Sequence, residues 1–234
     1  MARRRSGSAA GILGGLAAVG LAGYGAWVGL AWMRYGREAQ SAHVASDALL
    51  DDFMPTFDVC ERHHVRVQAP ADTVFGAACE LDLLHHPLVR AIVRAREVLL
   101  GAEPDRRPRP RGLLAETRAL GWGVLAERPG REIVMGAVTR PWEPRVTFRA
   151  LPPDAFAAFD EPGYVKIVWT LRADEEGPST SVFRTETRAL ATDAEARARF
   201  RRYWALLSPG IVLIRLLSLG PVRARAERLT SASR

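Results

Sequence analysis

Two pairs of histidines are the residues of this chain with the clearest capacity for chemistry. His63 and His64 are neighbours in an alternating segment, so their side chains point to opposite faces and do not readily share one ion. His85 and His86 precede Pro87, where a helix would begin. No Cys, His or carboxylate spacing completes a zinc site around either pair. We therefore predict no metal site and treat these histidines as ordinary surface or core residues.

Motifs that bind phosphate or activate a nucleophile are missing from the sequence. There is no P-loop, no glycine-rich fingerprint after a strand and no G-x-S-x-G turn. The tripeptide Gly121-Trp122-Gly123 is more typical of a β-bulge than of a phosphate cradle. Cys60 and Cys79 lie among apolar neighbours, so we expect two buried free thiols. We predict no cofactor and assign no catalytic residue.

Six segments alternate between apolar and polar residues as half-buried β-strands do. They are residues 62–68, 113–120, 132–139, 145–150, 164–172 and 181–190. The connections between the last five are short and hold no helix long enough for a parallel crossover. We therefore predict an antiparallel sheet with one buried face and one solvated face.

Helices are predicted before and after this run of strands. Asp72 is a suitable N-cap for a short helix, and a second helix begins near Asp82 and ends by Gly101. Thr192 or Asp193 caps a long helix that closes the chain. Its apolar residues recur every three to four positions, so it is expected to bury this stripe against the inner face of the sheet. Within it, Pro209-Gly210 is expected to produce a kink.

One uncharged stretch, residues 9–33, is long enough to cross a bilayer. It holds 25 residues without Asp, Glu, Lys, Arg, His or Pro, whereas a membrane helix needs about 20. Trp27, Trp32 and Tyr35 gather at its C-terminal end, as an interfacial aromatic belt would. A cleaved signal peptide would have a shorter apolar stretch, and a soluble core helix would show a polar face. We predict a single-pass anchor that contacts the lipid bilayer through residues 9–33.

The residues around and within this anchor bear on its orientation and association. Three arginines precede the stretch and two follow it, a balance that favours a cytoplasmic N-terminus and an extracytoplasmic domain. Gly11 and Gly15 have the small-xxx-small spacing that permits self-association of membrane helices, although glycine is also simply frequent in such helices. We divide the chain into an anchor (1–36), a linker or stalk (37–61) and one domain (62–230).

The net charge of +7 does not indicate a nucleic-acid-binding protein. Without the five arginines that flank the anchor, residues 38–234 hold 28 basic and 26 acidic residues. The C-terminal segment 197–234 is nevertheless basic, with nine Arg and one acidic residue, Glu227. This segment is either a surface for anionic headgroups or a solvated helix face.

Two stretches carry a resemblance to a known family. The first is HVRVQAPADTVFGAACELD (64–82), an alternating strand followed by A-P-A-D and a helix. The second is FRTETRALATDAEARARFRRYWALLSPG (183–210), a last strand that runs into a long helix. Over about residues 63–230 the chain resembles the START-like superfamily (also called SRPBCC or birch-pollen-allergen-like). This resemblance implies an α+β helix-grip fold, in which a curved antiparallel sheet wraps around the C-terminal helix over a cavity for an apolar ligand.

The residues expected to line this cavity are apolar, with a few hydroxyl groups that would orient a ligand. They are Thr117, Met135, Phe148, Trp169, Phe183, Thr185, Thr187, Phe200, Trp204 and Ile211. The expected function is binding of a hydrophobic ligand, such as a lipid, an isoprenoid or a polyketide-like molecule, next to the membrane. The segment 156–163 is either a lid near the cavity entrance or a loop packed on the sheet.

Two other functions stay open at this point. Some members of the resembled superfamily are cyclases or dehydratases, and such an enzyme needs an inward-facing titratable group. Glu186, Arg184 and His63 are the candidates, and for the first two a one-residue slip in register would be required. The third function is a non-catalytic membrane scaffold whose core is filled by its own side chains.

Overall fold

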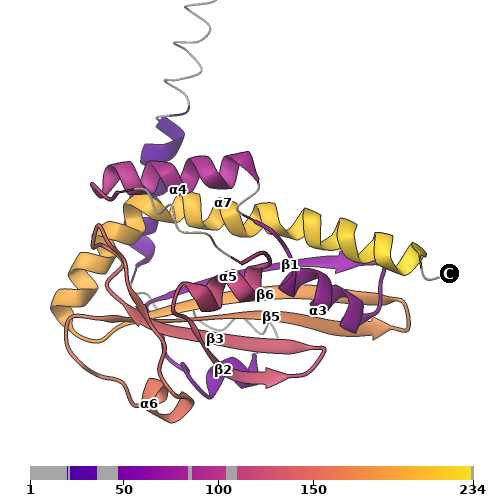
Figure 1. Ribbon diagram of the computed structural model, residues 1–234. Helices are drawn as coiled ribbons and strands as arrows, with labels where there is room; N and C mark the ends of the chain where they lie inside the picture. Colours follow the sequence, from indigo (N-terminus) through magenta and orange to yellow (C-terminus); the bar gives the residue numbers. More distant parts are fainter. Residues whose placement is uncertain (1–19, 21, 36–46, 84–85, 104–109, 233–234) are drawn as a thin grey trace, which may run out of the picture.

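The computed structural model describes residues 20, 22–35, 47–83, 86–103 and 110–232, which form an α+β fold. Figure 1 shows a sheet with several helices stacked on one side and smaller segments on the other. Residues 22–34 are helical and are called the N-terminal helix below. The other elements are α2 (Ala48–Asp51), β1 (Val59–Val67), α3 (Ala71–Cys79), α4 (Pro87–Leu99), α5 (Leu113–Ala119), β2 (Gly123–Arg128), β3 (Glu132–Thr139), β4 (Phe148–Arg149), α6 (Pro153–Ala157), β5 (Val165–Gly177), β6 (Thr180–Ala191) and α7 (Ala194–Ala232).

The sheet has six strands, and all of their pairings are antiparallel. Its order is β1-β6-β5-β3-β2, and β4 pairs with β3 outside this path. The last strand, β6, runs directly into α7, which lies along one face of the sheet (Figure 1). The predicted fold class, an antiparallel sheet with a long C-terminal helix in the helix-grip order, is therefore confirmed.

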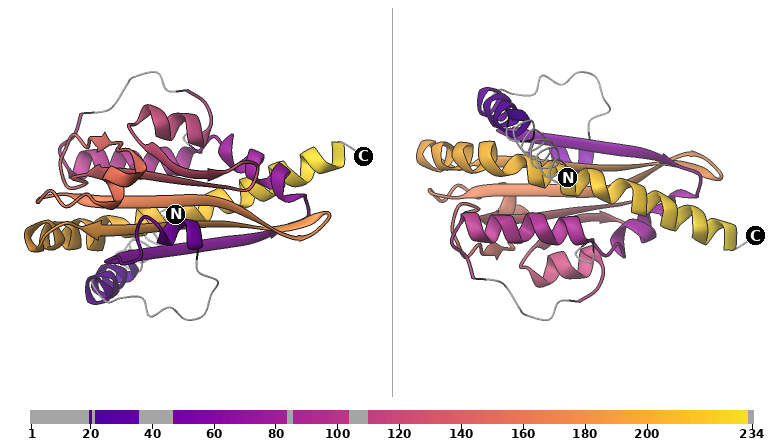
Figure 2. Two further views of the ribbon diagram at one scale, coloured as in Figure 1. Left: turned by 90° about the horizontal axis from the view of Figure 1, so that it is seen from below. Right: turned by 90° about the horizontal axis from the view of Figure 1, so that it is seen from above.

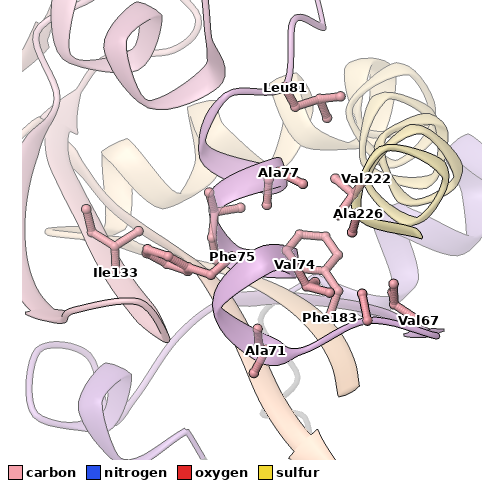
Figure 3. Packing of buried hydrophobic residues seen from close by; sticks show 14 of the residues in the cluster. Val67, Ala71, Val74, Phe75, Ala77, Leu81, Ile133, Phe183, Val222 and Ala226 are labelled. Carbon is pink, nitrogen blue, oxygen red and sulfur yellow. The ribbon is translucent and has the colours of Figure 1, made fainter. Parts of the chain in front are cut away.

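The inner face of the sheet, defined here as the face toward α7, is apolar. Val67, Ile133 and Phe183 come from three different strands and pack together with α3 and α7. Figure 3 shows Val74 and Phe75 of α3 among these strand residues and close to α7. The alternation that predicted which strand residues face inward is thus correct for β1, β3, β5 and β6, while α3 occupies part of the space between α7 and the sheet.

The outer face of the sheet is also covered, so the predicted solvated face is wrong. Leu50 and Met54, in and after α2, pack with Val134, Val168 and Phe156, and all five side chains are buried. Figure 1 places α6 and the violet segment around α2 on the side of the sheet opposite α7. Residues 47–58 therefore cover the sheet, although they lie in the range expected as a linker. For segment 156–163 the sequence left open a lid or a loop packed on the sheet. The side chain of Phe156 is fully buried on this face, which agrees with packing on the sheet.

An ionic network lies inside this covered outer face. Arg188 is 1% exposed and donates hydrogen bonds to Glu186 at 2.7 Å, to Asp51 at 2.6 Å and to the carbonyl of Met54 at 2.7 Å. Arg62 donates to the same Glu186 carboxylate at 2.7 Å. Because both cations are paired and hydrogen-bonded, the network can be buried without an uncompensated charge.

Residues 113–120 form helix α5, not the predicted strand. Leu, Ala, Glu and Arg are good helix formers, and a short segment that mixes them can satisfy both periodicities. Gly112 (φ 96°) begins the helix and Gly121 (φ 102°) follows it. A Cβ at Gly121 would lie 2.3 Å from the carbonyl oxygen of Phe148, so no larger residue fits this turn. The tripeptide 121–123 is therefore a turn into β2, and the bulge lies in β2 between Val124 and Ala126.

Helix α7 runs without interruption through Pro209 and Pro221. Asp193 caps it, since its Oδ1 accepts a hydrogen bond from the Ala196 N–H at 2.9 Å. Figure 1 shows a bend between the orange and the yellow part of α7, as expected for a proline that removes an N–H from the helix ladder. A Cβ on Gly210 would lie 2.7 Å from Ile92 Cγ2, which shows how closely α4 crosses α7.

The predicted anchor lies mostly outside the described residues, because residues 9–19 and 21 are not among them. The described part, residues 22–34, is one helix with mostly exposed side chains. Among the described residues, α7 is the one helix that is long and apolar enough to cross a membrane by length and composition. That criterion alone is weak, since core helices of soluble proteins also meet it.

We predict that Arg188→Ala destabilises the fold far more than Arg184→Ala does. Removing Arg188 takes away one of the two cationic partners of the buried Glu186 carboxylate, and the loss of a partner from a buried ion pair costs about 3–5 kcal/mol in the free energy of unfolding. Arg184 is 38% exposed in its side chain and pairs with Asp174, so its removal is expected to cost less than about 1 kcal/mol. Denaturant unfolding of the full chain in detergent measures both values. Equal losses would show that the outer-face network is not a structural element.

Candidate functional site

The inner face of the sheet carries two separate apolar clusters, and α7 contributes to both. The first contains Trp169 and Phe183 of the sheet, α3, and Val222 in the C-terminal half of α7. The second contains Val165 of β5 together with Phe200 in the N-terminal half of α7. The two clusters therefore lie at different positions along the same helix–sheet interface, and on β6 the inward-facing residues between them are Thr185 and Thr187.

Arg215 of α7 is the central polar residue of this region. Its Nη1 donates a hydrogen bond of 3.3 Å to the hydroxyl of Thr185 on β6. Its guanidinium carbon lies 5.3 Å from the centre of the Trp169 ring on β5, a cation–π contact. Thr187 lies opposite Trp169 in the β5–β6 register, and alternation puts its side chain on the same face. The helix thus directs one cation onto the inner face of the sheet, between the two apolar clusters.

The charge of Arg215 has no carboxylate partner among the described residues. In the described part of the chain Arg215 forms no ion pair, and its hydrogen-bond acceptor is the neutral Thr185 hydroxyl. Burial lowers the pKa of Arg215 to about 10, so the guanidinium still carries its charge at neutral pH. A half-buried cation without a counter-charge is costly, so an anionic group would be favoured at this position.

His63 of β1 lies beside Arg215 on the same face. Its partner in the β1–β6 register is Thr185, and burial and the neighbouring Arg215 charge both lower the pKa of the imidazole. Its Nε2 is buried without a hydrogen-bond partner, and the nearest carboxylate oxygen, on Glu61, lies 3.9 Å away. The imidazole is therefore neutral at pH 7 and has a ring nitrogen available to a ligand.

The predicted site residues fall into three groups in the structure. Met135, Trp169 and Phe183 belong to the first apolar cluster, while Phe200, Trp204 and Ile211 belong to the second or pack against it. Thr185 and Thr187 lie between the clusters. Thr117 and Phe148 are placed elsewhere, at the edge of the sheet where Trp122 packs 4.9 Å from Phe148.

Thr117 does not offer its hydroxyl to this region. It lies on helix α5, where its hydroxyl donates to the carbonyl of Leu113 at 2.6 Å. Thr117 was expected to face this region because 113–120 was predicted as a strand, in which side chains alternate between two faces. In a helix the side chains repeat every 3.6 residues, so Thr117 points in another direction. Arg215, in contrast, was not identified from the sequence. A signal for it exists, since Arg215 is the one charged residue within the stretch 203–222.

Two of the three candidates for acid–base catalysis lie on the wrong face. Glu186 belongs to the outer-face network; burial alone would raise the pKa of this carboxyl, but hydrogen bonds from Arg62 and Arg188 hold it below its usual value. Arg184 pairs with Asp174 at 2.7 Å. The register slip that would have brought these residues inside does not occur. His63 is the candidate that faces inward; the neighbouring Arg215 charge lowers its pKa, and the nearest carboxylate, that of Glu61, is too far away for a hydrogen bond.

Glu132 is a second buried titratable group, and it lines a shallow hollow of about 190 Å³. Burial and the nearby Asp47 carboxyl raise the pKa of Glu132 to about 7. The arginines of this hollow are paired: Arg128 with Glu132 at 3.3 Å, and Arg131 with Glu175 at 2.6 Å. Because these charges are already compensated, the hollow offers a ligand much less than Arg215 does.

Another hollow of about 300 Å³ lies where the β2–β3 turn, the β5–β6 hairpin and the start of α3 meet. Its lining includes Pro70, Pro129 and Pro178, and its charged residues Arg131 and Glu175 bind each other. We therefore regard the region around Arg215, Thr185 and His63 as the candidate site.

No family model and no curated protein matches the chain. Solved structures that align with it include CalU16 from Micromonospora echinospora, at 14% identity over 74% of this chain and 86% of that chain, with a TM-score of 0.26. Mll3558 from Rhizobium loti aligns at 14% identity over 67% and 96%, with a TM-score of 0.26. The Zhui aromatase/cyclase from a Streptomyces species aligns at 16% identity over 73% and 94%, with a TM-score of 0.22. Similarities at this level carry no inference, so the function has to be argued from the residues of this chain.

We predict that Glu132 makes the folded state less stable as the pH rises. Its pKa is about 7 in the folded chain and near 4.5 when unfolded, so between these values the folded state holds the extra proton. The free energy of unfolding therefore falls as the pH rises from about 4.5 through 7. Glu132→Gln should remove this part of the slope and stabilise the protein at pH 8 by about 1–3 kcal/mol.

The measurement is the pH dependence of denaturant unfolding for the full chain in detergent, expressed as the difference between the variant and the wild type. Glu127→Gln, on the neighbouring strand β2 and exposed, is the matched control and should leave the slope unchanged. A Glu132→Gln variant that is less stable than the wild type at pH 8 would mean that ionised Glu132 stabilises the fold.

Proposed function

We propose that this chain is a membrane-anchored module that binds a hydrophobic ligand with an acidic group between α7 and the inner face of the sheet. The observation that carries the proposal is the half-buried Arg215 guanidinium, which lies between two apolar clusters, against Trp169 and Thr185, and pairs with no carboxylate of the described residues. An acidic amphiphile has the matching chemistry. Its anionic group would accept hydrogen bonds from Arg215, and its apolar part would lie along the clusters.

The neighbouring residues support an orienting role for this polar region. The Thr185 and Thr187 hydroxyls can donate to an oxyanion or accept from a protonated acid. The buried Nε2 of His63 supplies one more polar atom at the same place. Trp169 offers an aromatic face next to the guanidinium, where an apolar chain could pass. A ligand would have to separate α7 from part of the sheet, and the bend in α7 gives its two halves room to move independently (Figure 1).

The ligand itself can be identified from the purified protein. The full chain, extracted in a mild detergent, is expected to retain a stoichiometric acidic amphiphile, such as a fatty acid or an isoprenyl phosphate, that mass spectrometry identifies. Arg215→Gln keeps the size and polarity of the side chain but removes its charge, so it should weaken binding of that ligand about 10- to 100-fold. Arg202→Gln, an exposed arginine on the same helix, is the matched control.

A second variant tests the apolar part of the site. Trp169→Arg places a second cation beside Arg215 and should abolish uptake of the apolar ligand. Circular dichroism checks that the variant is folded. If the folded Trp169→Arg protein binds an apolar fluorescent probe as well as the wild type does, the site is wrong. No ligand and no probe binding in the wild type would favour the scaffold whose core is filled by its own side chains.

The anchor is tested separately, by fractionation of cells that produce the full chain. The wild type should stay with the membrane fraction after alkaline carbonate extraction. Leu16→Arg combined with Leu21→Arg puts two charges near the centre of the stretch 9–33, at about 2.5–3.5 kcal/mol each for insertion, and should release the protein. A wild type that is itself released by carbonate would rule out an integral anchor.

A further inference from the structure

The large apolar side chains that the described part of the chain exposes to solvent are confined to three helices. None of them lies on the sheet, on α2, α3, α5 or α6. They are Tyr24, Trp27, Leu30, Trp32 and Met33 of the N-terminal helix, Leu88, Val98 and Leu99 of α4, and Leu206, Leu213, Leu216 and Leu229 of α7. Scattered exposed leucines are ordinary, but a set that is restricted to one group of helices marks an interaction surface.

These three helices lie on the same side of the sheet and are called the helical layer below, although only α4 and α7 lie flat along the sheet while the N-terminal helix stands at a steep angle to them (Figure 1). Viewed from above, in the right panel of Figure 2, α7 lies between the N-terminal helix and α4, side by side with both. Figure 1 shows the same layer edge-on, with the sheet beneath it and α6 at the far side. The exposed residues Leu206, Leu213 and Leu216 of α7 follow at helical spacing, so they form one stripe along the outside of this helix.

Helix α7 is joined to the described end of the predicted anchor by polar contacts. The indole of Trp27 donates to the Ser208 hydroxyl at 3.2 Å, and Tyr24 donates to the carbonyl of Leu206. Arg201 donates to the carbonyl of Trp32 at 2.8 Å and stacks on its ring at 4.0 Å. Residues 201–208 of α7 therefore lie at the same level as the tryptophans that end the predicted membrane span.

We infer that the layer of the N-terminal helix, α7 and α4 is a membrane-docking surface, and that the exposed stripe of α7 lies in the interfacial region of the bilayer. Tryptophans at the end of a membrane helix sit at the headgroup level. Since α7 is bonded to them at residues 201–208 and bends after this point, its leucine stripe is carried along the bilayer surface. The inference uses only the anchor part of the proposed function and is independent of the ligand.

The composition of α7 agrees with an interfacial helix. Only 28% of its most apolar stretch is buried inside the protein, and Leu206, Leu213 and Leu216 are exposed there, so part of this apolar surface is left for another medium. Arginines are exposed around it, on α4 and α7, where anionic headgroups would meet them. They are Arg90, Arg94, Arg202, Arg223 and Arg228. A second protein copy would explain apolar exposure too, but it would not explain why this surface is continuous with the anchor and rich in arginine.

A fluorescent label at single introduced cysteines can locate the surface relative to lipid. Burial raises the pKa of Cys60 to about 12 and that of Cys79 to about 11, so both native thiols should label slowly at pH 7, and the wild type serves as the blank. The test positions are Leu213→Cys and Leu99→Cys, Ala26→Cys reports on the anchor, and Asp154→Cys on α6 is the matched control on the far side (Figure 1). The full chain is reconstituted in vesicles of phosphatidylcholine and phosphatidylglycerol that contain doxyl-labelled lipid.

The inference expects labels at positions 213 and 99 to lose about twofold or more of their fluorescence to the lipid quencher, because an interfacial helix buries ~5–10 Å into the headgroup region. The label at 154 should lose little. Quenching at 26 without quenching at 213 would overturn the docking surface while leaving the anchor intact. Absence of quenching at 26 as well would instead mean that the anchor itself is wrong. If the label at position 213 is shielded from lipid and the cysteine at this position crosslinks to a second copy of the chain, this face is a self-association surface and the docking inference is wrong.

Discussion

Helix α7 is apolar on more than one side, and every one of those sides has to meet an apolar environment. Toward the sheet, Val222 and Phe200 are buried in the first and the second cluster on the inner face, and α3 fills the interface around Val222 (Figure 3). Toward α4, the approach is so close that a Cβ at position 210 would lie 2.7 Å from Ile92 Cγ2. The remaining stripe, Leu206, Leu213 and Leu216, is exposed. The arrangement of the whole helical layer follows from this requirement, because apolar surface is stable only when it is removed from water.

One arginine, Arg215, lies within that apolar interface. Its surroundings differ from those of Arg188, which is fully buried on the other face of the sheet. On the outer face, Arg188 is surrounded by Glu186, Asp51 and a backbone carbonyl, so its charge is balanced by the protein. On the inner face, Arg215 has a neutral hydroxyl and an aromatic ring. The first arrangement fastens residues 47–57 to the sheet. The second leaves the Arg215 guanidinium without a counter-charge from the described residues, which is the property expected of a site that binds an anionic group.

The docking surface and the candidate site lie on opposite sides of α7. Arg215 is directed toward the sheet, whereas Leu213 and Leu216 are directed away from it, so one helix would separate the ligand from the bilayer. A ligand that partitions into lipid would then have to pass only this helix to reach Thr185. This geometry relates the two proposals physically: the helix that covers the site is also the helix that contacts the membrane. Its bend separates a half held against the N-terminal helix from a half held by α3.

The sequence by itself determined β1, β3, β5 and β6, their inward-facing residues and the long C-terminal helix, since alternation in 164–172 and 181–190 and the spacing of Phe200 and Trp204 are local signals. It did not predict β2. It failed for 113–120, where seven residues fit both periods, and it expected a solvated outer face that α2 and α6 in fact cover. It also missed Arg215, because a lone charge in an apolar run gives no indication of what lies opposite. Only the tertiary structure decided that Arg215 meets Thr185 and Trp169 while Arg188 meets two carboxylates. The physical reason is that periodicity fixes which way a side chain points along its own element, whereas its counter-charge is supplied by residues far away in the chain.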